Sequence, residues 1–191
     1  MVEPPLVAIL AAGRASRFGG GKLDAPCAGK PLGRWVLDAV AGAGLPSGVV
    51  VTASAGGAFA AGTGWRQAIN PHAEQGLGTS IALAARTAIA GNARALLVLL
   101  ADMPLVDAAY LRRLASATPP TATAHPDGDP GVPALFGAAQ LPALANLGGE
   151  RGAAALLNVM DGLGVLQPPA GMLRDVDTVE DLAQVERLLE R

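Results

Sequence analysis

LVAILAAGRASRFGGGK, residues 6–22, is the segment that most narrows the choice of fold. Its first five residues are apolar and predict a buried strand, and a glycine-rich loop follows without a break. Glycines let the backbone approach an anion closely, while Arg14, Arg17 and Lys22 supply positive charge. The segment therefore predicts a phosphate-binding loop at the end of a first strand. Taken alone, it is also compatible with a flexible turn whose cations are solvated.

Two common phosphate-binding motifs do not fit the spacing of this loop. A P-loop of the form GxxxxGK[ST] would need a glycine at Ser16 and a hydroxyl residue at Leu23. A dinucleotide fingerprint, GxGxxG, fails because the first glycine after Gly13 is Gly19. The loop is therefore a different kind of phosphate cradle.

Downstream of the loop, apolar runs alternate with alanine-rich amphipathic stretches. The runs predict strands at residues 6–10, 48–53, 65–70, 95–101 and 132–136. The amphipathic stretches predict helices at residues 32–43, 79–90, 107–117 and 179–191, and two short helices within 139–160. Residues 118–131, rich in Pro, Thr and Asp, are predicted to be a loop or an edge region.

This alternation is typical of an α/β protein with right-handed crossovers and a mostly parallel sheet. We expect a single three-layer, Rossmann-like domain over residues 1–191. In such sheets ligands bind beyond the carboxyl ends of the strands. The loop after Leu10 and the residue Asp102, which directly follows the apolar run 95–101, should meet at that edge.

Several acidic residues have both a structural and a functional interpretation. A carboxylate at the exit of a buried strand is well placed to hold Mg²⁺ against a triphosphate, although Asp102 could equally be a turn residue before Pro104. Asp107 is predicted to cap the helix that follows it, and Asp177 or Thr178 to cap the last helix.

The composition argues against several classes of function. With a net charge of −2 over 191 residues, the chain has no bulk attraction for nucleic acid, and we predict no nucleic-acid partner. One cysteine and two histidines are too few for a disulfide or a thiolate metal site, so any metal should be a hard cation held by carboxylates. No signal peptide and no membrane-spanning apolar run is recognisable. We therefore expect a cytoplasmic protein without membrane contact.

The glycine-rich loop resembles a known signature. Residues 10–13, 16–19 and Lys22, followed by Gly29-Lys30-Pro31-Leu32, are similar to the signature loop of the MobA-like nucleotidyltransferases. Within that family the loop most resembles that of the molybdenum cofactor cytidylyltransferases. One departure is Leu23-Asp24-Ala25-Pro26, where the family usually has a Gln-Leu-Leu-Pro type of stretch. The resemblance implies a nucleotidyltransferase fold of the GT-A-like type.

Three further segments resemble motifs of the same family. Asp102-Met-Pro-Leu is similar to the family's metal-binding motif, and residues 70–80 are similar to a segment that lies near the base and the sugar. Residues 175–182 are similar to the C-terminal motif, which implies that Asp177 is a second metal ligand, with Asp175 as the alternative.

The resemblance thereby implies a set of functional residues. Catalysis would depend on Arg17, Lys22 and Asp102, and Mg²⁺, or Mn²⁺ in its place, would be held by Asp102 and Asp177. The implied nucleotide-binding residues are Leu10, Ala11, Ala12, Gly13, Arg14, Ser16, Arg17, Lys22, Asn70, Gly76 and Ser80.

The acceptor side of the family's cleft is resembled by residues 131–136 and 147–157. Three positions depart from the family, which commonly has His at Val132, Asp at Glu150 and a basic residue at Ala154. These departures bear on the identity of the acceptor more than on the type of reaction.

The implied reaction is attack by an acceptor phosphate on the α-phosphorus of an NTP, with loss of pyrophosphate. Such transfers need positioning and charge neutralisation more than a protein nucleophile. Cytidylyl members typically carry Leu-Ala-Ala-Gly and guanylyl members Leu-Ala-Gly-Gly, so the methyl group of Ala12 favours CTP over GTP. The implied acceptor is molybdopterin, and the product would pass to a molybdoenzyme or its chaperone through a transient contact.

Other hypotheses stay open at this point. The chain could transfer a guanylyl or another nucleotidyl group to a different phosphorylated acceptor. An NAD(P)-dependent oxidoreductase would fit the fold class but lacks the fingerprint. A non-catalytic nucleotide sensor or cofactor chaperone would be indicated by lost metal ligands, yet Asp102 and Asp177 are both present.

Overall fold

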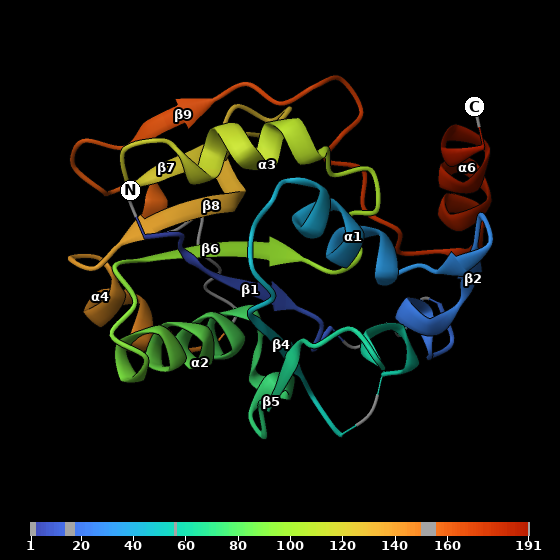
Figure 1. Ribbon diagram of the computed structural model, residues 1–191, viewed down its shortest axis with the longest axis horizontal. Coiled ribbons are helices and arrows are strands. Elements are labelled where there is room, and N and C mark those ends of the chain that lie inside the picture. Colours follow the sequence, from blue (N-terminus) through green and yellow to red (C-terminus); the bar gives the residue numbers. More distant parts are fainter. Residues whose placement is uncertain (1–2, 14–17, 56, 150–155, 191) are drawn as a thin grey trace.

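In the computed structural model, which describes residues 3–13, 18–55, 57–149 and 156–190, a seven-stranded sheet forms the centre of the molecule (Figure 1). The strand order is β5-β4-β1-β6-β8-β7-β9. The strands are β1 (Leu6–Leu10), β4 (Val49–Thr52), β5 (Arg66–Ile69), β6 (Ala95–Leu100), β7 (Thr121–Ala124), β8 (Pro130–Gly137) and β9 (Gly164–Leu166).

The sheet is mostly parallel, as the alternation of elements predicts. β1 pairs in parallel with both β4 and β6, β4 pairs in parallel with β5, and β7 pairs in parallel with β9. Only β8 runs the other way, antiparallel to β6 and to β7. The carboxyl ends of β1, β4, β6, β7 and β9 therefore lie at one edge of the sheet.

Helices cover both faces of this sheet and make the fold three-layered (Figure 1). α1 (Arg34–Gly42) and α3 (Ala108–Ala115) lie on one face, and α2 (Leu77–Ala90) and α4 (Leu141–Ala145) lie on the other. Away from the sheet, α6 (Val179–Leu189) lies beside a small hairpin of β2 (Pro26–Cys27) and β3 (Lys30–Pro31). Three 3-10 turns complete the described elements: η1 (Lys22–Asp24), η2 (Ala58–Ala60) and η3 (Ala73–Gln75).

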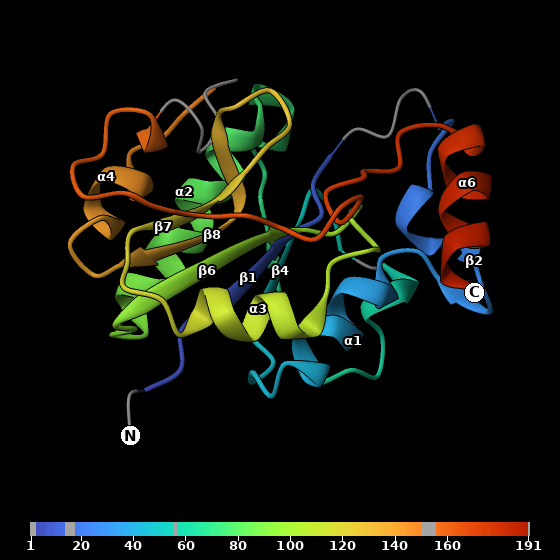
Figure 2. The same cartoon turned by 90° about the horizontal axis from the view of Figure 1, so that it is seen from above.

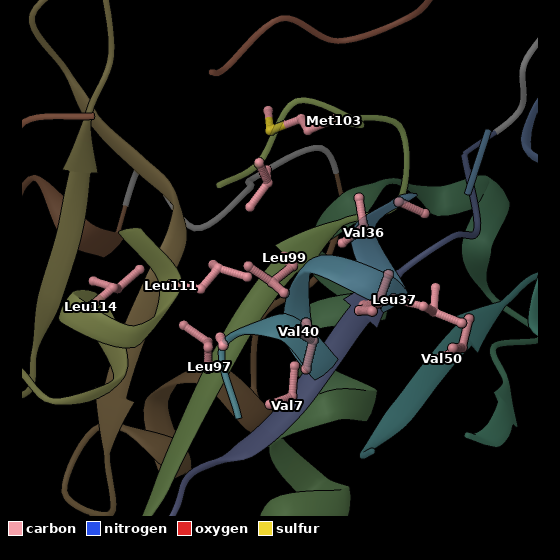
Figure 3. Packing of buried hydrophobic residues seen from close by; sticks show 14 of the residues in the cluster. Val7, Val36, Leu37, Val40, Val50, Leu97, Leu99, Met103, Leu111 and Leu114 are labelled. Carbon is pink, nitrogen blue, oxygen red and sulfur yellow. The ribbon is translucent and has the colours of Figure 1, made fainter. Parts of the chain in front are cut away.

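Successive side chains of β1 point to opposite faces of the sheet and so contribute to two separate layers of the core. Val7 and Ile9 are fully buried against α1 and α3, in the layer drawn in Figure 3. Ala8 and Leu10 face the other layer, which is built on α2. Small, fully buried alanines on α2 let this helix pack closely on the sheet, which suits a chain with only 3% aromatic residues: Ala82, Ala84, Ala85 and Ala88.

The structure confirms most of the predicted elements and corrects one region. Residues 118–131, predicted as a loop or edge region, contain β7 and the start of β8, so β7 is an inner strand paired on both sides. Its sequence, Thr-Ala-Thr-Ala, has no large apolar side chain, and its burial comes entirely from its neighbours. Strand β9 and the β2–β3 hairpin have no counterpart among the predicted elements.

Smaller differences occur at the helix boundaries. α1 begins at Arg34 rather than Leu32, because Pro31 belongs to the hairpin. Two short helices are predicted within 139–160: α4 is one of them, and residues 150–155 of that range lie outside the described residues. Across the described ranges, no helix is both long enough and apolar enough to cross a membrane.

The start of α6 is closed by a capping box. The Thr178 hydroxyl accepts a hydrogen bond from the Asp181 N–H (3.1 Å), and the Asp181 carboxylate accepts one from the Thr178 N–H (2.9 Å). These bonds satisfy backbone N–H groups that a helix N-terminus otherwise leaves unpaired. Thr178 is therefore the N-cap, which is one of the two residues that the sequence predicted for this position.

We expect Thr178→Ala to lower the free energy of unfolding by about 1 kcal/mol, the usual cost of a lost N-cap. For a domain of this size the melting temperature should fall by about 2–4 °C, measurable by thermal unfolding.

Hydrogen bonds from Thr178, and then from the Asp177 N–H, hold the pKa of Asp181 below its ordinary value of 3.8.

A depressed carboxyl pKa stabilises the fold above the ordinary value, and this contribution is lost as the pH falls through the lowered pKa. The stability difference between the wild type and Asp181→Asn should therefore shrink below about pH 3.8. A difference that stays constant with pH would contradict this role of the carboxylate.

Candidate nucleotide and metal site

The loop after β1 and the residues after β6 lie side by side at the carboxyl edge of the sheet. Hydrogen bonds continue the strand pairing past the strand ends: Ala101 N–H donates to the Leu10 carbonyl (3.0 Å) and Ala11 N–H to the Val51 carbonyl (2.8 Å). Asp102, one residue further on, is thereby fixed next to the glycine-rich loop, as the sequence predicts.

Lys22 joins three segments that are far apart in the chain. Its Nζ donates to Asp102 Oδ2 at 2.8 Å and to Asp177 Oδ1 at 3.1 Å, across 80 and 155 residues of sequence. Lys22 lies on the short turn η1 after Gly21, whose φ of 62° is in the left-handed region that favours glycine. The lysine is only 7% exposed, so its side chain is held between the two carboxylates.

The charges at this junction influence one another. Burial alone would lower the pKa of Lys22, but its ion pair and hydrogen bond with Asp102, followed by those with Asp177, outweigh burial and raise it. The pKa of Asp175 is raised by desolvation and by the nearby charges of Asp177 and Asp102. Lys22 is therefore held in its charged form, in a cluster where carboxylates outnumber ammonium groups.

Asp177 is held by backbone contacts on both of its sides. The Val176 N–H donates to the carbonyl of Asp102 (3.0 Å), and the Asp177 N–H donates to Asp181 Oδ2 (3.2 Å). The first bond ties the C-terminal segment to the end of β6, and the second ties it to the capping box of α6. Both bonds place the second carboxylate opposite the first.

Glu186 is a supporting residue that the sequence interpretation did not single out. Its Oε1 accepts a hydrogen bond from the Ala28 N–H (2.8 Å), in the tight turn of the β2–β3 hairpin. Cys27 of β2 and Leu32, which follows β3, pack with Val176 and Val185 in a small buried cluster. α6 therefore links the β2–β3 hairpin to the segment that carries Asp177.

Asp24 is a second supporting residue, and it lies in the stretch that departs from the family pattern. Its Oδ1 accepts a hydrogen bond from the Phe59 N–H (2.7 Å), and the Phe59 ring is buried against Gly33 and Gly57. A Cβ on either glycine would come within 2.7 Å of the ring, so small residues are needed there. In the sequence, the only sign of this supporting role of Asp24 is that it lies in the stretch that departs from the family pattern.

Two open cavities lie on either side of the loop that follows Leu10, and Asp102 lines both. One lies toward α2 and is lined by Ala12 and Gly13 of the loop and by Gly76 and Ser80 of the α2 side. The other lies toward η1 and η2; its lining includes Ala11, Lys22, Asp24, Thr52 and Phe59.

Asn70 lies beneath the first cavity rather than in its lining. The Asn70 amide nitrogen donates to Thr79 Oγ1 (2.8 Å) and Ser80 Oγ (2.9 Å), and its oxygen accepts from the His72 N–H (3.0 Å). The side chain is 3% exposed, and all its polar atoms have partners. Asn70 thus shapes the segment that carries Gly76 and Ser80.

The structure therefore brings most of the predicted site residues together. Lys22 contacts both Asp102 and Asp177. Leu10, Ala12 and Gly13 line one cavity together with Gly76 and Ser80, and Ala11 lines the other. Arg14, Ser16 and Arg17 lie outside the described residues.

The donor set suits a hard divalent cation that is shared with a substrate. Within the described residues, no group of three or more His, Cys, Asp or Glu side chains is arranged to hold a metal. Mg²⁺, however, usually binds through one or two carboxylates plus substrate phosphates, and keeps several waters. Asp102 and Asp177 supply two such carboxylates beside the glycine-rich loop, so the residues present fit a metal that arrives with a nucleotide.

Comparisons with known proteins agree with this geometry. A family model described as the MobA-like NTP transferase domain matches residues 7–164. The purine catabolism protein PucB of Bacillus subtilis (strain 168) is 28% identical over 204 residues, which span 99% of this chain and 100% of PucB.

Solved structures share the fold over nearly the whole chain. Rv0371c from Mycobacterium tuberculosis H37Rv is 28% identical with a TM-score of 0.76, covering 98% of this chain and 99% of its own. Its complex with manganese gives a TM-score of 0.76 at 24% identity, covering 97% and 99%. A nucleotidyl transferase from Methanothermobacter thermautotroptrophicus (Mth528) gives a TM-score of 0.82 at 23% identity, covering 100% and 99%.

Proposed function

Because the chain belongs to the MobA-like NTP transferase family, we propose that it is a Mg²⁺-dependent cytidylyltransferase that transfers CMP from CTP to the phosphate of molybdopterin and releases pyrophosphate. The observation that carries this proposal is the contact of Lys22 with both Asp102 and Asp177 at the carboxyl edge of the sheet, next to the glycine-rich loop. The proposal includes a cytoplasmic location and a transient contact with the molybdoenzyme, or its chaperone, that receives the product.

Lys22 and Arg17 are proposed to neutralise the β- and γ-phosphates and the charge of the departing pyrophosphate. The raised pKa of Lys22 supports this role, because the ammonium stays charged at any pH at which the enzyme would work. Fixed cations that face the developing charge stabilise the transition state without reorganising. Arg17 is assigned from its place in the signature loop.

Asp102 and Asp177 are proposed to hold the divalent cation. When bound, such a cation would supply Lewis-acid catalysis by polarising phosphoryl oxygens of the nucleotide. The manganese complex of Rv0371c supports a divalent metal in a relative with the same fold. A hard cation held by two carboxylates can be Mg²⁺ or Mn²⁺.

The acceptor needs no general base from the protein. A phosphate monoester is already anionic near neutral pH, so one of its oxygens can attack the α-phosphorus directly. The bond between the α-phosphorus and the β-bridging oxygen breaks as the new bond forms, and pyrophosphate leaves with that oxygen. The task of the protein is then to align the two phosphates and screen their repulsion.

The choice of nucleotide is proposed to depend on Ala12. This residue is 9% exposed and lines the cavity toward α2, where its methyl group takes up room that a purine would need. We expect CTP with MgCl₂ at about 100 times its Kd to stabilise the protein by about 2.7 kcal/mol and to raise the melting temperature by about 5–10 °C. GTP should have a much smaller effect.

Ala12→Gly should raise kcat/KM for GTP at least about tenfold in a pyrophosphate-release assay, because the space of one methyl group is worth that much in a tight pocket. Ala11→Gly is the matched control, because Ala11 is next in the chain but lines the other cavity. If GTP stabilises the wild type more than CTP does, the proposed type of reaction stands, but the role of Ala12 in selecting CTP is wrong.

A further inference from the structure

Two side-chain hydrogen bonds join the segment that carries Lys22 to the segment that carries Asp177. Lys22 Nζ donates to Asp177 Oδ1 across 155 residues of sequence, and the Ala28 N–H donates to Glu186 Oε1 across 158. The second bond lies where α6 runs beside the β2–β3 hairpin (Figure 2). The proposed function gives a role to both members of the first pair and to neither member of the second.

The ion pair of Lys22 with Asp177 does not by itself fix how these two segments lie. Its atoms are 3.1 Å apart, and the Asp177 side chain is 47% exposed. Ion pairs with so exposed a partner contribute little to stability, because solvent and salt screen them. A single contact also allows the two segments to rotate about it. The position of Lys22 relative to Asp177 therefore depends on further contacts between the segments.

The turn of the β2–β3 hairpin is held to α6 by a carboxylate. Cys27 pairs with Lys30, so Ala28 and Gly29 are the two turn residues. Ala28 has a φ of 46°, in the left-handed region that a residue with a side chain seldom adopts. Glu186 Oε1 accepts from its N–H at 2.8 Å, and a charged acceptor makes such a bond about twice as strong as a neutral one. Glu186 therefore both anchors the turn and stabilises its conformation.

Backbone hydrogen bonds connect this hairpin to Lys22. The Leu32 N–H, just after β3, donates to the Ala25 carbonyl (2.9 Å), and the Ala25 N–H donates to the Lys22 carbonyl (3.2 Å). The Gly33 N–H donates to the Leu23 carbonyl (2.9 Å). The short turn η1, which carries Lys22, is thus attached to the hairpin, and a shift of the hairpin would move the lysine.

The same helix holds Asp177 from the other direction. The Asp177 N–H donates to the Asp181 carboxylate in the first turn of α6, and Glu186 lies further along this helix. Val185, next to Glu186, is fully buried with Cys27 of the hairpin. One helix therefore fixes Asp177 at its start and the hairpin near its end.

We propose that Glu186 is a positioning residue for nucleotidyl transfer: by anchoring the Ala28 turn to α6, it sets where Lys22 lies relative to Asp177. The inference rests on the proposed function, in which Lys22 faces the phosphates and Asp177 holds the metal. A misplacement of about 1 Å in such a site can cost about 10²-fold in rate. The proposed place of the base is the cavity toward α2, away from this contact, so the effect falls on kcat more than on KM for CTP.

Glu186→Ala should lower kcat about tenfold or more and change KM for CTP less than about threefold. The assay is pyrophosphate release with CTP, MgCl₂ and molybdopterin. Glu186→Gln should restore kcat, because its amide oxygen can accept the same bond from the Ala28 N–H. Glu190→Ala is the matched control and should keep the wild-type kcat, since Glu190 is the exposed C-cap residue of α6, one turn beyond Glu186.

Cys27 provides a second readout that needs neither nucleotide nor metal. It is the only cysteine of the chain and is fully buried in the hairpin, so Ellman's reagent reaches it when the hairpin moves away from α6. Burial, and then the charges of Glu186 and Glu190, raise the pKa of this thiol. Glu186→Gln and Glu190→Ala each remove one of these charges and measure the effect of charge alone. Glu186→Ala should speed the reaction about tenfold beyond either, the effect of losing a hydrogen bond to a charged group.

The inference is wrong if kcat of Glu186→Ala stays within a factor of about two of that of Glu190→Ala, or if Glu186→Gln is as slow as Glu186→Ala. It is also wrong if Cys27 reacts no faster in Glu186→Ala than in the two charge controls. If Glu186→Ala does not fold, Glu186→Met, which keeps the bulk of the side chain without the carboxylate, takes its place. If the wild type releases no pyrophosphate and CTP does not stabilise it, the proposed function fails, while the Cys27 reaction still decides whether Glu186 holds the hairpin.

Discussion

Replacement of Asp102 by alanine should lower the rate of nucleotidyl transfer by about 10³-fold or more while leaving the protein folded, because the proposed metal loses the ligand that the sheet holds most rigidly. The same change removes the nearer of the two carboxylates that raise the pKa of Lys22. Pyrophosphate release measures the rate, and thermal unfolding should show that MgCl₂ with CTP no longer stabilises the variant.

Asp107→Ala provides a matched control for this prediction. Asp107 lies five residues beyond Asp102, and its carboxylate caps α3 by accepting from the Tyr110 N–H (2.7 Å). Its loss should cost about 1 kcal/mol of stability and leave the rate of transfer nearly unchanged. If Asp102→Ala kept more than a tenth of wild-type activity, the assignment of Asp102 as a metal ligand would be wrong.

Lys22→Met should lower kcat by about 10²–10³-fold, since the phosphates lose a fixed cation in a partly water-excluded site. Without nucleotide, we expect the same variant to bind Mn²⁺ more tightly than the wild type, because the ammonium group no longer competes for Asp102 and Asp177. Titration of Mn²⁺ followed by electron paramagnetic resonance would separate this effect from the loss of activity.

Lys30→Met is the control for Lys22. Lys30 belongs to the same signature segment, but its Nζ pairs with Asp38 and lies over the Trp35 ring, away from the two carboxylates. This variant should keep activity within a factor of about three, because exposed ion pairs contribute little. Weaker Mn²⁺ binding by Lys22→Met would show that the lysine supports the metal site instead of competing for it.

Local sequence patterns were enough to predict the central strands, the position of Asp102 and the start of α6. β1 and β6 are continuous apolar runs long enough to be buried on both faces, and the structure has them as the central parallel pair. Asp102 lies two residues after the end of β6, so its place at the carboxyl edge needed no knowledge of distant residues. The capping box of α6 is equally local, since its two partners are three residues apart.

Other features depend on contacts between segments that are distant in the chain. β7 is a buried strand because β8 and β9 pair with it, and its Thr-Ala-Thr-Ala sequence has no large apolar side chain that would predict burial. Glu186 reads as an ordinary surface residue of an amphipathic helix, yet it bonds to Ala28 across 158 residues. Asp24 and the Phe59 N–H are likewise joined only in the folded chain.

The sequence by itself determined the fold class, the order of the main strands and helices, and the residue types at the carboxyl edge, because hydrophobic periodicity, glycine content and helix caps are local properties. Only the tertiary structure decided that Lys22 contacts both Asp102 and Asp177, and that a separate cavity opens at the ends of β7 and β9. The physical reason is that ion pairs and cavities depend on how distant segments pack, and side-chain packing has no period along the chain.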